Sequence, residues 1–524
     1  MNGAYDVIDT SFFPSIGTVK PGARGDGQRP ARRRPPAGTP AASKRRMAMT
    51  TKTAVAELAG AQEWPSRADR TAQGTDARVL APLESHADFT PYPARDPVGL
   101  LLKQAESRVP ELVPVRHERM LVSPFAYYRG AALPMAADLA TTPTSGLRVQ
   151  LCGDAHLANF GAFASPERRL VFDVNDFDET LPGPFEWDVK RLAASLAVAG
   201  RDNGFGRKAR RKIILAGVRR YREAIRTFAR QPFLEVWYAH LDIEDAIDDF
   251  KAQMTAKRLK DSKVMAAKAR AHNSMQALRQ LTTDIDGQPR FISDPPLMVP
   301  IEELYPDMRA DEIYKLMAGV LDSYRSTLPY DRRYLLQHFT LTQVARKVVG
   351  VGSVGTRAWV VMMDARDGTG PLVLQAKEAQ QSVLANYIGH SRYRHQGERV
   401  VAGQRLMQAQ SDIFLGWTHV VGQDGVDRDY YLRQLKDWKF SVPIERTKRS
   451  SLEHYTSLCG WTLARAHARS GDRIALAAYL GGTDLFDEAI ADFAETYADQ
   501  NELDHAALRA AVRDGRAQAT TETR

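Results

Sequence analysis

Two short apolar stretches that each run straight into acidic residues constrain the fold of this chain more than any other feature. LRVQLC (147–152) leads into Gly153 and Asp154, and RLVFDVNDF (169–177) leads into Asp178. A short apolar run that stops at a turn signal is typical of a buried β-strand. Asp154 then lies on a tight loop after its strand, and further carboxylates crowd the end of the second strand. The chain is therefore expected to fold into a mixed structure in which short strands present acidic loops.

Helical patterns surround these strands and dominate the rest of the chain. We expect helices over 186–200 and 206–228, and the last hundred residues return to helix. In the second helix the apolar residues at helical spacing are Ile214, Val218, Tyr221, Ile225 and Phe228. Near the C-terminus one helical face consists of Leu485, Phe486, Ala489, Ile490, Phe493 and Tyr497. Together with strand-like segments around 340–440, these patterns predict a helix-rich α+β fold.

The N-terminal segment differs in composition from the rest of the chain. Residues 1–46 hold nine Lys or Arg and three Asp or Glu, so 9 − 3 = +6 of the formal net charge of +9 lies there. Pro, Gly, Ala and Arg dominate, and such a segment buries too little apolar surface to offset its chain entropy. We expect residues 1–75 to be a disordered basic tail. The remaining charge gives no footprint for specific nucleic-acid binding, and weak nucleic-acid contacts by the tail are the alternative.

Cysteine usage and hydropathy favour the cytoplasm. Cys152 and Cys459 are the two cysteines of the 524-residue chain, too few for a disulfide framework or a CxxC metal knuckle. The N-terminus has acidic residues where a signal peptide needs basic ones. No stretch approaches the roughly 18–20 apolar residues of a membrane helix. We therefore expect a cytoplasmic protein without membrane partners.

The acidic loops carry the kind of oxygen ligands that Mg²⁺ prefers. Asp154 and Asn159 lie on the first loop, and Asp173, Asp176 and Asp178 crowd the end of the second strand. Phosphoryl transfer uses such an ion at the phosphates and a separate carboxylate that orients the attacking hydroxyl. The same residues could instead cap turns, a role that Asp and Asn often take.

A glycine-rich segment between two expected strands supplies a second candidate binding element. Gly350, Gly352, Ser353 and Gly355 fit G-x-G-x-x-G, and Lys377 lies on the strand that follows. Glycine lets backbone N–H groups approach phosphates without a Cβ clash, and a strand lysine can reach the same phosphates. A strand and not a helix follows the glycines, so the segment does not resemble a dinucleotide-binding fingerprint. Hairpins also use glycine routinely, so the motif gains meaning only beside the acidic loops.

The acidic-loop segments resemble the aminoglycoside and choline kinase-like phosphotransferases. GDAHLAN matches their G-D-x-H-x-x-N loop, VNDFDE resembles their metal-binding strand end, and FEWDVKRLA resembles their later helix start. The resemblance implies that Asp154 is the catalytic base and that Asn159 and Asp176 bind Mg²⁺. It also implies that Asp188 is a structural residue that braces the loop.

By the same resemblance, the glycine-rich segment and Lys377 form the nucleotide side of the site. A glutamate from a following helix holds the lysine in protein kinases. Glu398, at the start of an expected helix (398–412), is the candidate, because Glu378 would point to the opposite face of its strand. The segment 430–439 would be the strand and hinge beside adenine.

The order of these parts departs from the kinase pattern. In those families the glycine-rich loop and the lysine precede the catalytic loop, whereas here they follow it by about 200 residues. The implied fold is a circularly permuted, protein kinase-like two-lobe fold, and permutation is acceptable because a site depends on geometry rather than on sequence order. An unpermuted alternative takes Asp472 of HARSGD as the base, although Gly471 also fits a helix C-terminal cap there. The expected parts are the tail (1–75), a helical lobe (95–335), a β-containing nucleotide-binding lobe (336–440) and C-terminal helices that pack on the helical lobe (441–524).

The region from about 95 to 510 also resembles a bacterial family known as domain of unknown function 2252. SPFAYYRGAA, GDAHLANFG, FDVNDFDET, FEWDVKRLAAS and ARAHARSGD carry that likeness. The family is grouped with kinase-like folds, but the resemblance implies no substrate. Arg129, within YYRGAA, is a candidate for a phosphate contact or for an ion pair with an acidic neighbour.

These observations lead to one expected function and two alternatives. We expect an ATP- and Mg²⁺-dependent phosphotransferase that transfers the γ-phosphate to the hydroxyl of an unknown small-molecule or protein acceptor. The first alternative is a nucleotide-binding pseudokinase that regulates without turnover. The second is a metallophosphoesterase, whose metal motif also opens with G-D-x-H but which needs a later GNH segment that this sequence lacks.

Overall fold

The computed structural model describes residues 65–250, 264, 266–271, 274–348, 350–422, 424–435 and 437–520. Helices and strands are mixed along this part of the chain, and helices hold the larger share, so the expected helix-rich α+β class is confirmed. Residues 1–64 of the expected tail lie outside the described residues. Among the described helices, none combines the length and the hydropathy that crossing a membrane requires.

The described chain begins with helix α2 (Arg67–Leu80), inside the region expected to be a tail. The Ser66 hydroxyl accepts a hydrogen bond from the Asp69 N–H, and the Asp69 carboxylate accepts one from the Ser66 N–H, which together cap the helix. A Cβ at Gly74 would lie 2.0 Å from a backbone oxygen of α19 (Arg473–Leu480), so the two helices pack closely. The expectation of disorder up to residue 75 is therefore wrong from Arg67 onward.

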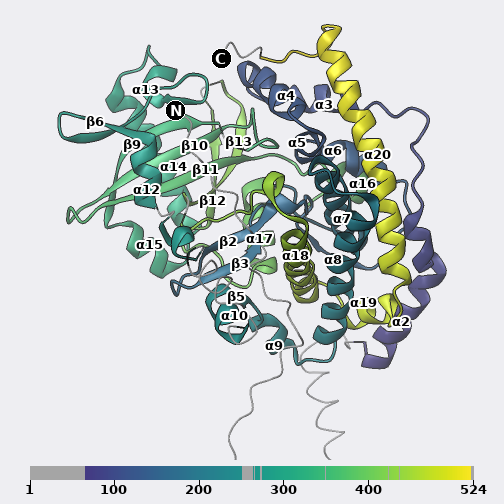
Figure 1. The fold of residues 1–524 in the computed structure, drawn as a ribbon. Coiled ribbons are helices and arrows are strands. Elements are labelled where there is room, and N and C mark those ends of the chain that lie inside the picture. Colours follow the sequence, from purple (N-terminus) through teal and green to yellow (C-terminus); the bar gives the residue numbers. More distant parts are fainter. Residues whose placement is uncertain are drawn as a thin grey trace, which may run out of the picture.

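One antiparallel sheet forms the β-rich part of the molecule (Figure 1). Its strands lie in the order β12-β13-β11-β10-β9-β8, and β9 and β10 form the expected hairpin around the glycine-rich segment. The strand bounds are Met298–Pro300 (β8), Phe339–Lys347 (β9), Ala358–Ala365 (β10), Pro371–Ala379 (β11), Gly416–Val421 (β12) and Asp427–Gln434 (β13).

Residues before position 336 also belong to the β-rich part of the molecule, so the expected boundary at residue 335 is wrong. Ile313 and Tyr324 lie in one apolar core with Leu374 and Leu432 of the sheet. The helices involved are α13 (Ile301–Leu304), α14 (Ala310–Ser326) and α15 (Tyr330–Leu336). The boundary is shifted because the apolar face of α14 is buried on the sheet and not on the helical body.

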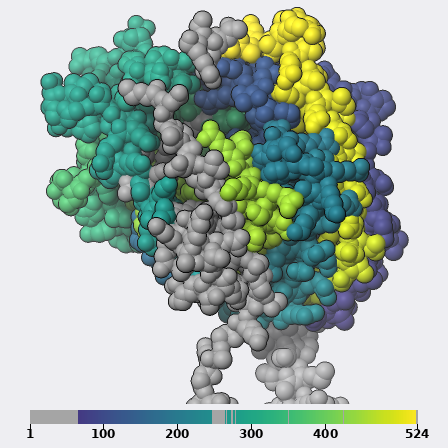
Figure 2. Space-filling model, in the orientation of Figure 1, coloured from purple at the N-terminus to yellow at the C-terminus, as the bar shows by residue number. Residues whose placement is uncertain are grey.

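The remaining long helices form a helical body beside the sheet. In Figure 2 the β-rich part lies on the left in lighter teal and green, and the helical body lies on the right in purple, blue, dark teal and yellow. A Cβ at Gly460 would lie 2.2 Å from the Gly217 carbonyl oxygen, so α8 and α18 cross in close contact. The apolar face expected over 206–228 is buried, whereas Leu485 from the C-terminal face is 43% exposed at the start of its helix. The helices are α3 (Pro97–Ala105), α4 (Val113–Leu121), α5 (Pro124–Gly130), α6 (Ala132–Leu139), α7 (Phe185–Asp202), α8 (Arg207–Phe228), α17 (Gln396–Met407), α18 (Arg449–Ser470) and α20 (Leu485–Arg513).

Two small sheets present the acidic loops where the helical body meets the large sheet. The first pairs β1 (Arg148–Leu151) with β4 (Leu181–Pro184). The second contains β2 (Phe160–Ala164), β3 (Leu170–Val174) and β5 (Leu241–Asp242). The short connecting elements are η1 (Leu83–Ala87), η2 (Pro110–Leu112), η3 (Leu157–Asn159), α9 (Phe233–Tyr238), α10 (Ile243–Phe250), α12 (Ser274–Leu281), β6 (Thr282–Ile285), β7 (Gln288–Phe291), α16 (Ala385–Ile388) and η5 (Ile444–Arg446).

A buried ion pair ties the second small sheet to the C-terminal helices. Arg465 of α18 places its Nη2 atom 2.5 Å from both carboxylate oxygens of Asp173 on β3. Burial raises the pKa of Asp173, and the charge of Arg465 opposes that rise. Asp173 is therefore a structural residue, and it holds α18 against the strand that leads to the acidic loop.

We predict that Arg465→Met lowers the free energy of unfolding by about 3–5 kcal/mol, because Asp173 would stay buried without its partner. Urea unfolding followed by circular dichroism measures the change. Arg513→Met is the matched control, since its ion pair with Asp514 lies in solvent and should contribute less than about 1 kcal/mol. Equal losses in the two variants would contradict the structural role of the buried pair.

Candidate functional site

Two cavities lie side by side between the large sheet and the helical body. The first, called the lysine cavity because Lys377 lines it, has a volume of about 410 Å³ and is bordered by the residues that follow β13. The second, called the arginine cavity because Arg108, Arg116 and Arg129 line it, has a volume of about 470 Å³ and contains Asp154. The residues that line both cavities are Asp176, Gly350 and Ser353. The structure thus brings the acidic loops and the glycine-rich segment to one cleft.

The loop that carries Asp154 is fixed by its backbone. Gly153 has a φ of +85°, and a Cβ there would lie 2.3 Å from the Glu179 carbonyl oxygen, so only glycine fits. The Asp188 carboxylate at the start of α7 accepts hydrogen bonds from the N–H groups of Cys152 at 2.8 Å and Gly153 at 3.0 Å. The expected bracing of this loop by Asp188 is therefore confirmed.

The Asp154 carboxylate is held on one side by an arginine. Arg191 of α7 donates to Oδ1 from Nε at 2.8 Å and lies 2.7 Å from the same oxygen through Nη2. The other oxygen lies 3.6 Å from Nε2 of His156. Burial lowers the pKa of His156 to about 4, so this imidazole is neutral near pH 7. Oδ2 of Asp154 is thus the oxygen left to face the arginine cavity.

The β2–β3 hairpin brings Asn159 next to the second acidic loop. Phe160 pairs with Val174, and the Asn175 N–H donates to the Asn159 carbonyl oxygen at 2.8 Å. The Asn159 side-chain amide donates to the Asp154 carbonyl oxygen at 2.8 Å, so its amide oxygen is directed away from that bond. Asn159 and Asp176 both line the arginine cavity. Amide and carboxylate oxygens are the kinds of ligand that suit a hard cation such as Mg²⁺.

Lys377 joins the sheet to the acidic loop across a separation of 201 residues. Its Nζ atom lies 2.8 Å from Oδ2 of Asp178 and 3.5 Å from Oδ2 of Asp176. Burial acts to raise the pKa of Asp176, but Lys377 and Arg433 outweigh it and the pKa is lowered. Asp176 is therefore ionised at neutral pH, as a ligand for a cation must be.

Lys377 does not form the ion pair with Glu398 that the sequence led us to expect. Among the described residues its acidic partners are Asp176 and Asp178. Arg399 is the residue of α17 that reaches the acidic loop, and its Nη2 donates to the Asp178 carbonyl oxygen at 2.8 Å. The next residue along a helix points about 100° away, so this rotation of α17 turns Arg399 and not Glu398 towards the loop.

The glycine-rich loop is docked on the helical body. Val354 is fully buried with Val109, and the Val109 N–H donates to the Gly355 carbonyl oxygen at 2.8 Å. The Ser353 hydroxyl donates to Asp178 at 3.3 Å. A Cβ at Gly352 would lie 3.2 Å from a backbone oxygen of α5, so glycine permits this close approach. The loop therefore covers the junction of the two cavities.

Several site residues were not singled out from the sequence. Tyr431 donates to Oδ1 of Asp178 at 2.6 Å, and Arg433 donates to the Asn175 carbonyl oxygen at 2.9 Å. They reach the site because β13 pairs with β11, and this register is not visible in the sequence. Arg191 had a local signal, since it lies one helical turn after Asp188 and therefore on the same face of α7.

The alternative base Asp472 has a structural role in a different place. Its carboxylate caps α19 by accepting from the N–H groups of Ile474 at 2.9 Å and Ala475 at 3.1 Å. It also forms an ion pair with Arg70 at 2.6 Å and lines neither cavity. Gly471 is the C-terminal cap of α18, as the sequence predicted.

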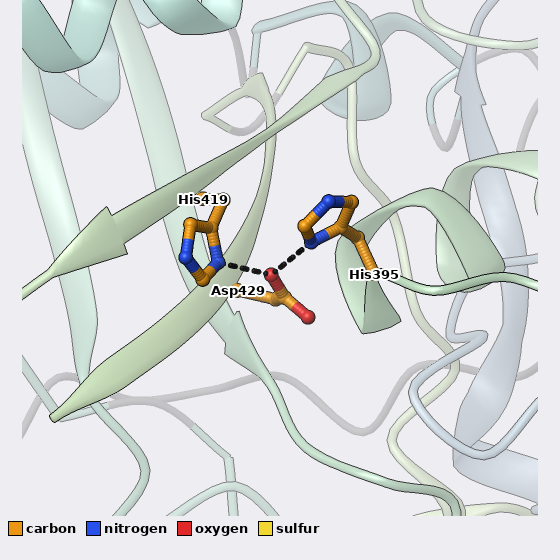
Figure 3. A group of neighbouring side chains, drawn as sticks. All are labelled: His395, His419 and Asp429. Atoms are coloured by element: carbon orange, nitrogen blue, oxygen red, sulfur yellow. Dashed lines mark hydrogen bonds and ion pairs between the residues drawn. The ribbon is translucent and has the colours of Figure 1, made fainter.

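A separate group of candidate metal ligands lies at the start of α17. His395 and His419 flank Asp429, with their Nδ1 atoms 3.1 and 2.9 Å from its Oδ1 (Figure 3). One ligand atom from each residue lies within 4.8 Å of the others, a spacing that could hold a divalent cation. Hydrogen bonds alone also satisfy both oxygens of Asp429, because the second oxygen accepts a hydrogen bond from the Gln396 N–H at 2.6 Å. The group anchors the start of α17 and lines neither cavity.

Glu179 adds a pH-sensitive group beside the arginine cavity. Its carboxylate accepts a hydrogen bond from the Val383 N–H at 2.7 Å. Burial raises its pKa to about 7, and the charge of Arg399 only partly offsets that effect. Because the pKa is raised from 4.5, the contribution of Glu179 to stability is full below about pH 4.5 and is lost as the pH rises to about 7.

We predict that Glu179→Gln removes this loss while keeping the bond from Val383. The free energy of unfolding of the variant, relative to the unmodified protein, should increase between about pH 5 and about pH 8. Urea unfolding at the two pH values measures this change in the free energy of unfolding. Glu84→Gln is the control, because Glu84 is exposed. A difference that does not change with pH would show that Glu179 ionises normally.

The fold and cleft can be compared with known proteins. One family model matches residues 108–511, and its description is an uncharacterized protein conserved in bacteria (DUF2252). None of the curated proteins and none of the solved structures compared with the chain matches it. The family match includes both acidic loops, the glycine-rich segment and Lys377. Because it spans more than half of the sequence, the chain belongs to the bacterial DUF2252 family.

Proposed function

We propose that this protein is an ATP- and Mg²⁺-dependent phosphotransferase with a circularly permuted, protein kinase-like site. One observation carries the proposal: Lys377 of the sheet lies 3.5 Å from Asp176 of the acidic loop, at the junction of the two cavities. In protein kinases a strand lysine and a metal-binding aspartate must both be in place at the phosphates. The pair therefore supports phosphates as the ligands of this junction.

The order of elements around the lysine cavity supports a nucleotide in that cavity. A hairpin with a glycine-rich loop (β9 and β10) is followed by a strand with a lysine (β11), a helix (α17) and two further strands. Protein kinases place a glycine-rich loop over the phosphates and the lysine on the third strand in the same way. Adenine would then lie against the segment that follows β13, where Leu435 lines the cavity together with Ile413 from the connection before β12. The cytoplasm, where ATP is available, remains the expected compartment.

Asn159 and Asp176 would hold Mg²⁺ at this site. Phosphate oxygens and water would supply the remaining ligands, because Mg²⁺ is usually bound beside a nucleotide by only one or two protein groups. When bound, the ion neutralises charge on the phosphates. Gly350, Gly352, Ser353 and Gly355 would cover the same phosphates from the sheet side.

Asp154 would orient the hydroxyl of a small-molecule or protein acceptor. Asp154 lines the arginine cavity, whereas Lys377 lines the neighbouring cavity. The acceptor would therefore enter through the arginine cavity. Because Arg191 occupies Oδ1, the oxygen that would accept the hydroxyl hydrogen bond is Oδ2. Asp154 would act on the acceptor and Asp176 on the metal and phosphates.

The contact with Arg191 also favours one alternative. Arg191 holds one of the two carboxylate oxygens of Asp154, which leaves less acceptor capacity for the hydroxyl of an acceptor. A nucleotide-binding pseudokinase that regulates without turnover would keep the lysine, the glycine-rich loop and the metal ligands. A metallophosphoesterase is disfavoured, because Lys377 lies between Asp176 and Asp178 and its positive charge would repel a second metal ion there.

We predict that two aspartate substitutions separate the functions of metal and acceptor binding. Asp154→Ala, and the isosteric Asp154→Asn, should reduce ATP turnover at least about 100-fold while Mg·ATP affinity stays nearly unchanged. Asp176→Ala should weaken Mg-dependent nucleotide binding at least about 10-fold as well as turnover. Calorimetric titration measures the affinity, and release of ADP with water as acceptor measures turnover.

Asp472→Ala is the control for this experiment. It removes a helix cap outside both cavities, so it should cost about 1 kcal/mol of stability and leave turnover intact. Normal turnover in Asp154→Ala together with loss of turnover in Asp472→Ala would overturn the assignment of the base. Nucleotide binding without turnover in the unmodified protein would favour the pseudokinase.

A further inference from the structure

Three arginines with little access to solvent line the arginine cavity. Arg108, between α3 and η2, is 5% exposed, and Arg116 of α4 is not exposed at all. Arg129 of α5 lines the same cavity and is half-buried. Taking a guanidinium out of water costs several kcal/mol unless a partner compensates for it.

The hydrogen bonds of these arginines leave much of their charge uncompensated. Arg116 donates from Nη2 to the Gly130 carbonyl oxygen and to Gln104, both at 2.9 Å, while its Nε and Nη1 have no partner. Arg108 donates from Nη1 to the Val354 carbonyl oxygen, and its Nε has no partner. The Arg129 guanidinium donates to no described residue, and its Nε is buried. The carbonyl oxygens offset only part of the cost.

Within the described residues, no carboxylate that lines the cavity forms an ion pair with the three arginines. Asp154 is held by Arg191, Asp176 and Asp178 by Lys377, Glu179 by the Val383 N–H and Glu378 by Arg357. Glu179, Glu378 and Asp178 act on Arg108 electrostatically and offset part of the cost of burying it. Glu445 and Asp154 are near enough to act on Arg129 electrostatically, but within the described residues neither forms an ion pair with it. The cavity therefore offers positive charge and unused N–H groups to a ligand.

From this arrangement we infer that the arginine cavity binds an oxyanion, a phosphate or a carboxylate, carried by the acceptor molecule. Arg129 contacts the anion, and Arg108 and Arg116 supply buried positive charge behind it. The planar guanidinium fork suits the paired oxygens of phosphate and carboxylate. The assignment to the acceptor rests on the proposed function, because Asp154 lines the same cavity and would meet the hydroxyl of the same molecule. The acceptor class is then a hydroxyl compound with its own anionic group.

Inorganic phosphate is the probe for this site. Calorimetric titration of phosphate into the nucleotide-free protein should show binding that Arg129→Met weakens at least about 10-fold and that Arg129→Lys weakens less. Arg116→Met should weaken it as well, provided that circular dichroism and thermal melting show the variant is folded. Arg230→Met is the surface control and should leave phosphate binding unchanged. Lys377→Met reports whether free phosphate binds at the junction instead.

A second arm distinguishes the acceptor from the nucleotide as the source of the anion. Phosphate should still bind when the protein is saturated with Mg²⁺ and a non-hydrolysable ATP analogue. Loss of phosphate binding under that condition would assign the arginines to the γ-phosphate and overturn the acceptor assignment. Binding that depends on Lys377 and not on Arg129 would overturn the site itself. Failure of the analogue to bind, with phosphate binding still sensitive to Arg129→Met, would defeat the proposed function and leave the anion site standing.

Discussion

The contact of Lys377 with Asp176 and Asp178 is the interaction on which the cleft depends. It joins a strand of the large sheet to a loop of the helical body, and both cavities meet beside it. A buried lysine would be costly without these carboxylates, and the carboxylates would repel each other without the lysine. The same contact therefore stabilises the joint between the two parts of the molecule, beside both cavities.

The rest of the cleft is built to hold that pair in place. Arg399 ties α17 to the backbone of the acidic loop, with bonds of 2.7 Å to Thr180 and 2.8 Å to Asp178. Arg465 ties β3 to α18, and Asp188 ties the Asp154 loop to α7. These contacts use ionised or backbone groups with little access to solvent, where each hydrogen bond is costly to lose. The acidic loops are thus fixed from three helices that lie far apart in the sequence.

The sequence predicted local structure and the clustering of motifs well, and long-range partners poorly. The helix over 206–228 and the strand before Gly153 were predictable, because periodicity and short apolar runs are local signals. The bracing Asp188 was implied by the resemblance to kinase-like phosphotransferases. Ser66 and Asp69 form a capping box that sequence reasoning overlooked, which is why the predicted tail was too long. The partners of Lys377 and Asp173 could not be predicted, because they depend on strand register and on the rotation of helices about their axes. The boundary at residue 335 failed for a similar reason, since an amphipathic helix such as α14 does not reveal which core it covers.

The central claim is that the junction at Lys377 and Asp176 binds the phosphates of a nucleotide together with Mg²⁺. Calorimetric titration of ATP into the unmodified protein, with and without Mg²⁺, tests it most directly. We predict one site per chain, with an affinity that rises at least about 10-fold when Mg²⁺ is present, because Asn159 and Asp176 would hold the ion and the ion would neutralise phosphate charge. Absence of ATP binding, or binding that Mg²⁺ does not change, would contradict the claim.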